Sequence, residues 1–228
     1  MLSLKQGLSL VSSNKAGSSS WTPTNESSLE AWYANKEGVS VTGVNVTSWD
    51  DSSTNSINMI QADENEQPIY NVSTGALTFD SSSKSNLQTT LQISVTEDFT
   101  LGISMKPTTT NGTFIGDNTT ANELFKISSA DKITVKVDSG TITLETNGGA
   151  SFGDDYIVIT RASDVFSLYR NGVEQTYKAT LTGTIDIDAI GIRRSNVNGF
   201  SGEIKEVQIY SSSSETLISN INDRLSSL

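Results

Sequence analysis

The chain has 228 residues, a net charge of −11 at pH 7, and neither cysteine nor histidine. Without these two residue types it has no disulfides, no thiolate nucleophile, and neither the commonest general base nor the commonest transition-metal ligand. Its acidity makes nucleic acid and anionic membrane surfaces poor partners, its length is typical of one all-β domain, and no window has the roughly 18 consecutive apolar residues of a membrane-spanning helix.

The first 28 residues differ in texture from the rest of the chain. Apolar side chains fall on even-numbered positions near the start: Leu2, Leu4, Leu8 and Leu10. A Ser-rich stretch follows, and Lys5 interrupts what would be the apolar region of a secretory signal. We expect residues 1–28 to be a docking arm and a flexible linker, with the extended arm adding to a sheet edge of another chain. The alternative is that the arm folds back as an edge strand of its own domain.

From residue 29 onward, short runs of Val, Ile, Thr and Phe are separated by clusters of Gly, Asn, Asp and Ser, a pattern typical of β-strands. In the run KITVKV, Ile133, Val135 and Val137 share one face and polar residues share the other. Such half-buried strands belong to antiparallel sheets with one wet face, and two of these sheets pack as a sandwich. We therefore predict one all-β domain over residues 29–228.

Two turn sequences support the prediction of antiparallel strands. Asp138, Ser139 and Gly140 separate two alternating runs, as in a short hairpin. Asn171-Gly172 is the preferred pair for a type I′ turn, because both central residues take positive φ. A ligand-binding loop is the alternative interpretation of the second sequence, since sandwich proteins often bind ligands at their loops.

One helix is expected, at residues 213–227. Ser212 precedes Glu215 by three residues, as in a capping box. The apolar residues that follow have helical spacing: Leu217, Ile218, Ile221 and Leu225. Such a helix packs either on a sheet of its own domain or on a neighbouring subunit.

Several short motifs occur in a characteristic order after the arm: Trp32, Trp49-Asp50, Gln67-Pro68, Phe79-Asp80, Tyr169 with Asn171-Gly172-Val173, and Gly202-Glu203-Ile204. This order, over residues 29–228, resembles the laminin-G-like, concanavalin A-like lectin/glucanase superfamily. The resemblance implies a jelly-roll sandwich of two antiparallel sheets, here with an N-terminal arm and a short C-terminal helix. That fold hosts lectins, glycosidases and structural modules, so it does not determine the function.

Among these proteins, the chain most resembles laminin-G-like proteins of tailed phages, marine and cyanobacterial ones in particular, which share an MLSL-type arm followed by an AWY strand. The resemblance implies a virion protein assembled in the host cytoplasm, such as a capsid decoration protein, a fibre or a tail appendage. Its partners would be other capsid or tail proteins, sister copies in a homo-oligomer, and surface glycans of the host or particle. We expect a structural protein anchored by its N-terminal arm. The alternative is a stand-alone glycan-binding lectin module.

The spacing of carboxylates along the sequence indicates whether the chain has the acid pair of a glycosidase. Retaining glycosidases need two carboxyl groups about 5–5.5 Å apart, and inverting enzymes place them farther apart. Glu203 and Glu206 are three residues apart and are expected on opposite strand faces. Asp186 and Asp188 share a face but have no third acid near them in the sequence. We therefore predict that the chain is not an enzyme, and a degenerate glycosidase is the third function considered.

Calcium is the one candidate metal, since it needs only oxygen ligands. Laminin-G-like domains often carry calcium near a Phe-Asp-Gly loop. Here Phe79-Asp80 is followed by Ser81, and Lys84 places a positive charge in the same loop. Two other loops, WDDSSTN and QADENEQ, are rich in oxygen atoms. We assign no metal ligand and expect no cofactor.

A sugar site needs exposed aromatic rings beside acids or amides. Trp32 and Trp49 match core positions of the fold and are expected to be buried. Four other aromatic residues are the candidates for glycan contact: Trp21, Tyr33, Tyr156 and Tyr177. Nothing in the sequence brings these four residues into one site.

Overall fold

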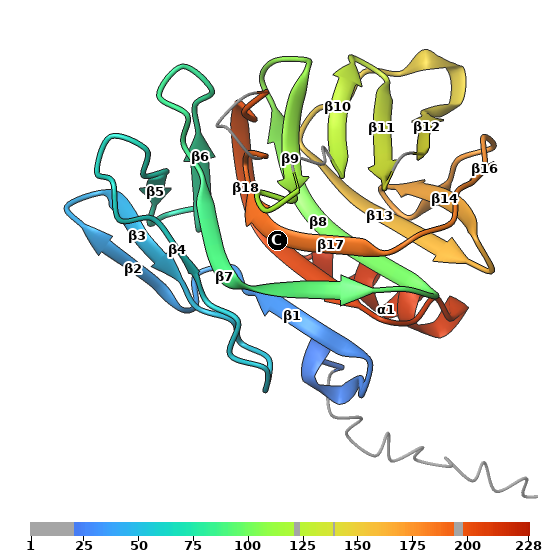
Figure 1. The fold of residues 1–228 in the computed structure, drawn as a ribbon, viewed down its shortest axis with the longest axis horizontal. Coiled ribbons are helices and arrows are strands. Elements are labelled where there is room, and N and C mark those ends of the chain that lie inside the picture. Colours follow the sequence, from blue (N-terminus) through green and yellow to red (C-terminus); the bar gives the residue numbers. More distant parts are fainter. Residues whose placement is uncertain (1–20, 121–123, 139, 194–197) are drawn as a thin grey trace, which may run out of the picture.

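Two antiparallel sheets dominate the computed structural model, which describes residues 21–120, 124–138, 140–193 and 198–228 (Figure 1). The first sheet comprises β1 (Leu29–Tyr33), β5 (Ile69–Asn71), β6 (Ala76–Phe79), β8 (Phe99–Pro107), β13 (Asp155–Ala162), β14 (Val165–Arg170), β15 (Val173–Glu174), β16 (Ala179–Thr180) and β18 (Gly202–Tyr210). The second comprises β2 (Val39–Thr42), β3 (Asn45–Trp49), β4 (Met59–Ile60), β7 (Leu87–Val95), β9 (Gly112–Gly116), β10 (Phe125–Ser129), β11 (Lys132–Val137), β12 (Gly140–Glu145) and β17 (Ile185–Ile190). Three helical segments complete the fold: η1 (Pro23–Asn25), η2 (Asn147–Gly149) and α1 (Glu215–Leu225).

The pairing of strands is antiparallel throughout both sheets. In the first, β18 pairs with β8, β8 with β13, and β13 with β14, while β1 and β6 pair with different parts of β18. In the second, β17 lies between β7 and β9, and β10 and β11 continue from β9. The two sheets meet at one edge, where Asn45 of β3 pairs with Ile69 of β5. The predicted all-β sandwich is confirmed.

The core between the sheets is built from the alternating positions that the sequence indicated. In β11, Ile133, Val135 and Val137 are fully buried, and the residues between them are partly exposed. Aromatic rings fill the centre, where Phe99 of β8 stacks on Phe125 of β10 with ring centroids 5.7 Å apart. The core therefore joins residues of both sheets.

Both predicted hairpins are present. Asn171 and Gly172 have φ angles of 51° and 76°, and they join β14 to β15 as a type I′ turn would. Val137 of β11 pairs with Gly140 of β12, next to the loop that joins these two strands. Asp138 in that loop has a φ of 50°.

The C-terminal helix α1 begins two residues later and ends two residues earlier than predicted. Ser214 is the N-cap, because its Oγ accepts a hydrogen bond from the backbone N–H of Leu217, and the predicted cap at Ser212 is wrong. The helix packs on the outer face of the first sheet, where its apolar stripe meets Val158 and Tyr210. It thus belongs to its own domain. Among the described residues, no helix is long and apolar enough to cross a membrane.

The docking-arm residues lie outside the described residues: Leu2, Leu4, Leu8 and Leu10. Residues 21–28, which the sequence assigned to the linker, pack on the sandwich. Pro23 is buried, and Trp21 contacts the cluster around α1 while its indole N–H donates to Glu26 Oε1 at 2.8 Å. The packed part of the chain therefore extends upstream of residue 29.

Candidate functional site

A groove of about 410 Å³ lies between α1 and the outer face of β13 and β14. Tyr156 and Tyr169 line it from the strands, and Gly172 lines it from the type I′ turn. The helix contributes Glu215, Ile218, Ser219, Asn222, Asp223 and Ser226. The groove thus combines aromatic rings on the sheet with polar side chains on the helix.

The alternation of side chains along the strands and the spacing of residues along α1 determine which side chains line the groove. Because side chains alternate along a strand, Tyr156 faces outward while Ile157 enters the core. Tyr156 and Val158 are two residues apart, so they share one face of β13. Val158 pairs directly with Tyr169 of β14, and the two tyrosines therefore lie on the same face of the sheet. Along the helix, the lining residues recur every three or four positions, the spacing of a single helix face.

The helix lines the groove with two carboxylates and an amide oxygen, which accept hydrogen bonds, and with two serine hydroxyls, which both donate and accept. Asn222 Oδ1 is buried and accepts no hydrogen bond from the described part of the chain. Glu215 and Asp223 add carboxylates. Burial, followed by the nearby charge of Glu174, raises the pKa of Tyr169 to about 12, and its hydroxyl donates to Glu174 Oε1 at 3.1 Å. A ligand that donates hydrogen bonds would satisfy this lining.

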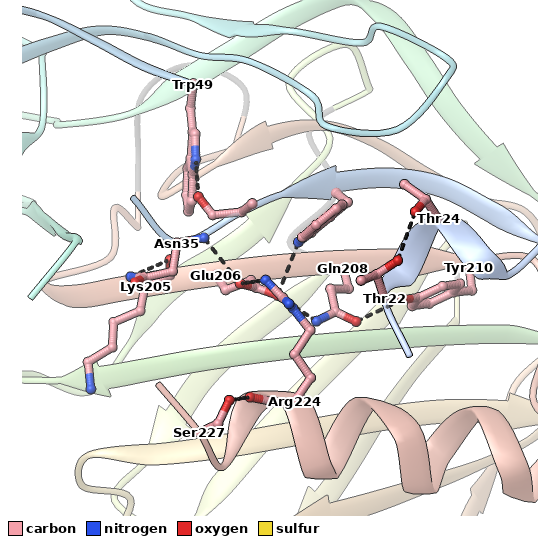
Figure 2. A network of polar contacts seen from close by, with 12 residues as sticks. Thr22, Thr24, Asn35, Trp49, Lys205, Glu206, Gln208, Tyr210, Arg224 and Ser227 are labelled. Atoms are coloured by element: carbon pink, nitrogen blue, oxygen red, sulfur yellow. Dashed lines mark hydrogen bonds and ion pairs between the residues drawn. The ribbon is translucent and has the colours of Figure 1, made fainter. Parts of the chain in front are cut away.

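A buried ion pair holds α1 against the sheet (Figure 2). The carboxylate of Glu206, on β18, is fully buried and accepts from Arg224 Nε and Nη2 at 2.5 and 2.9 Å. It also accepts from Trp32 Nε1 at 3.0 Å, from the backbone N–H of Asn35 at 3.1 Å, and from Gln208 Nε2 at 2.7 Å. A buried carboxylate with these partners is fully compensated.

The same network extends in two directions. The Arg224 guanidinium lies over the ring of Trp32, 4.6 Å from its centroid. Burial, and then the charge of Glu206, raises the pKa of Tyr210, so that its hydroxyl stays protonated and donates to Gln208 Oε1 at 2.7 Å. These contacts tie β1, β18 and the last turn of α1 together, so they position the helical wall of the groove.

A second groove, of about 390 Å³, lies on the other side of α1. Trp21 and Thr22 line it from the N-terminal segment, and Asn220, Asp223 and Arg224 line it from the helix. Asp223 contributes to both grooves. Because Arg224 is engaged with Glu206, its charge is already compensated.

The structure separates the four aromatic candidates for glycan contact. Tyr156 and Trp21 line the two grooves that flank α1. Tyr177 is 48% exposed and lies in the loop between β15 and β16, outside both grooves.

Tyr33 is wrong as a surface candidate. It is fully buried, its ring packs against Trp49 with centroids 5.7 Å apart, and its hydroxyl donates to the carbonyl of Ile57 at 2.7 Å. The alternation of β1 puts Tyr33 in the core with Ala31, while Trp32 faces the helix. The predicted burial of Trp32 and Trp49 is confirmed.

The prediction that Glu203 and Glu206 face opposite sides of their strand is also wrong. The pairing of β18 with β8 shifts between Ile204 and Glu206, which marks a bulge. Ile204 and Val207 both enter the core, so the glutamates beside them both lie on the outer face. The bulge is what aims Glu206 at α1.

A third acid lies beside Asp186 and Asp188, which the sequence did not indicate. Asp117, after β9, is fully buried, and burial together with the charges of these two acids raises its pKa, although hydrogen bonds from Thr120 and Thr119 oppose the shift.

Asp117 and Asp188 are occupied by donors. Asp188 accepts from the backbone of Asn118 at 2.5 Å and from Thr119, and Asp117 accepts from the backbone N–H groups of Thr119 and Thr120 and from the Thr120 hydroxyl. All four carboxylate oxygens thus hold one loop in place, a structural use.

In the loops considered for calcium, aspartate side chains accept hydrogen bonds from other groups of the protein. Asp51 accepts from the backbone of Trp32 and from Ser53, and Asp80 accepts from Ser82. Asp63 likewise accepts from its own loop. Within the described ranges, no three carboxylates gather into a group that could hold a metal ion.

Comparison with known proteins identifies the family. The profile of the concanavalin A-like lectin/glucanases superfamily matches residues 79–215, more than half of the chain, so the chain belongs to this superfamily. No curated protein matches the sequence.

Several solved structures are similar to this chain at low sequence identity. The sialidase of Trypanosoma rangeli in complex with sialic acid is 14% identical with a TM-score of 0.51, over 89% of this chain and 33% of that one. Domain 4 of AbnA, an arabinanase of Geobacillus stearothermophilus in complex with arabinotriose, is 16% identical with a TM-score of 0.48, over 86% and 97%. The CBM40 of Ruminococcus gnavus IT-sialidase bound to α2,3-sialyllactose is 21% identical with a TM-score of 0.42, over 55% and 82%.

Proposed function

We propose that this chain is a non-enzymatic carbohydrate-binding module whose ligand lies in the groove between α1 and β13–β14. The observation that carries the proposal is the pair Tyr156 and Tyr169 beside two carboxylates and an amide on the helix. Sugars present apolar C–H faces and a rim of donating hydroxyl groups, which complement aromatic rings and acceptors respectively. Membership of a superfamily that includes lectins is consistent with this function.

The proposal is tested by glycan-array binding followed by calorimetry on the intact chain. Tyr156→Ala is expected to weaken binding at least tenfold, which corresponds to about 1.4 kcal/mol. Tyr177→Ala removes an exposed tyrosine that lies outside the groove and should leave the affinity unchanged. Thermal unfolding of both variants checks that the fold is retained. Equal affinity of all three proteins, or no binding to any glycan, would refute the proposal.

We further propose that the module is displayed on a tailed-phage virion and is anchored there by its N-terminal arm. The resemblance to phage laminin-G-like proteins supports this role, and the core between the sheets is built from residues 31–209 without the arm. Mass spectrometry and immunogold labelling of gradient-purified particles test it. Regular labelling would support a structural role on head or tail. A chain found free in the lysate and absent from particles would favour a stand-alone lectin module instead.

A further inference from the structure

We infer that the groove beside α1 selects sugars that carry no negative charge, prefers an amino sugar to its acetylated form, and rejects sialylated glycans. The inference rests on the proposed function and specifies the chemical class of the ligand. It follows from the charges and hydrogen-bond acceptors that line the groove.

The charged side chains lining the groove are both acidic. Glu215 and Asp223 are exposed on the helix, and no lysine or arginine of the described chain lines the groove. A ligand carboxylate placed between them would meet repulsion at short range, because like charges a few ångströms apart at a protein surface disfavour each other.

The nearby cations are already paired with acids. Arg224 binds the buried carboxylate of Glu206. Lys178 binds Glu174, which also accepts from the Tyr169 hydroxyl at the edge of the groove. The cations therefore do not offset the two groove carboxylates, and the net charge of −11 acts in the same direction.

The hydrogen-bonding groups of the groove also favour a ligand that donates hydrogen bonds. Asn222 Oδ1 is a buried acceptor without a partner in the described chain, and a buried acceptor gains most from a ligand donor. Hydroxyl groups supply such a donor, and a protonated amine supplies up to three together with a positive charge. A carboxylate supplies none, so the charged group that distinguishes sialic acid cannot satisfy this acceptor.

The groove does include the start of α1, a place where helix geometry attracts anions. Here Glu215 is the first residue of the helix and already supplies a negative charge at that end. An anionic sugar would therefore meet this negative charge at the same end of the helix.

The test compares matched ligands on the intact chain by calorimetry at low salt. Lactose is paired with 3′-sialyllactose, and oligomers of glucosamine are paired with oligomers of N-acetylglucosamine. We expect sialylation to weaken binding at least tenfold and deacetylation to strengthen it at least threefold. Both ratios should shrink toward one at 1 M salt, where the screening length falls to about 3 Å.

The double variant Glu215→Gln/Asp223→Asn should bring both ratios close to one, because it removes the two charges and keeps a carbonyl acceptor at each position. Glu37→Gln removes an exposed acid outside the groove and is the matched control, with both ratios expected to persist. Sialyllactose binding as tightly as lactose would overturn the inference and leave the proposed function standing. If no sugar of any charge binds, the proposed function fails and the inference fails with it.

Discussion

Replacing Arg224 by methionine tests whether the buried ion pair holds α1 in place. The carboxylate of Glu206 is fully buried and receives five hydrogen bonds, two of them from Arg224. The substitution removes those two and the compensating charge, while the methionine side chain can still cover the ring of Trp32. Breaking a buried pair on one side costs about 3–5 kcal/mol. Because the Arg224 side chain is 22% exposed, water can partly replace it, so we expect about 3 kcal/mol.

A loss of this size should lower the melting temperature by about 6–12 °C, since each kcal/mol shifts a domain of 150–250 residues by about 2–4 °C. Urea unfolding followed by tryptophan fluorescence measures the loss in the free energy of unfolding, and thermal unfolding measures the melting temperature. Glu206→Gln in the same background removes the buried charge, so the double variant should lose less than the sum of the single losses. Lys205→Met is the control, because its ion pair with the exposed Asp154 is worth at most about 1 kcal/mol. A loss below about 1 kcal/mol for Arg224→Met, or strict additivity with Glu206→Gln, would refute the reasoning.

Three further predictions concern the framework of the site. Gly102→Ala would place a Cβ 2.5 Å from Ile221 Cγ2, so urea unfolding should show a loss of about 1–3 kcal/mol, and an unchanged midpoint would contradict this packing. Burial alone would raise the pKa of Asp155, but hydrogen bonds, led by that from Arg170, outweigh it and lower the pKa. Its contribution is therefore present above the unfolded value of about 3.9 and is lost as pH falls through the lowered folded value. Asp155→Asn should destabilise the fold at pH 7 and much less near pH 2; a gap independent of pH would argue against the pair. Gly172→Ala, at a φ of 76°, should cost about 1 kcal/mol in thermal unfolding, whereas no cost would exclude the turn geometry.

The fold could be predicted because its signals are local. Alternation over residues 132–137 fixes which side chains enter the core, whatever strand lies beside them. The same holds for Asn171-Gly172, whose turn depends on two residues, and for the stripe of α1, which depends on one helix face. The cap was not predicted correctly: the capping-box spacing indicated Ser212, whereas Ser214 accepts the hydrogen bond from Leu217.

The candidate groove could be predicted only in part, because it joins segments far apart in the chain. Tyr156 was indicated as an aromatic, but its neighbours on α1 are brought to it by the pair of Glu206 and Arg224. The bulge that aims Glu206 at the helix has no signal in a period-two pattern. Tyr33 could have been predicted correctly, because the alternation of β1 is enough to place it in the core beside Ala31.

The central claim is that a sugar binds between α1 and β13–β14. The most direct measurement is a ¹⁵N–¹H correlation spectrum of the intact chain titrated with neutral oligosaccharides. We predict that the largest shift changes occur at the amides of Tyr156, Gly172 and Asn222 and saturate together. Changes confined to other surfaces, such as the loop that carries Tyr177, or no change with any sugar of the panel, would contradict the account.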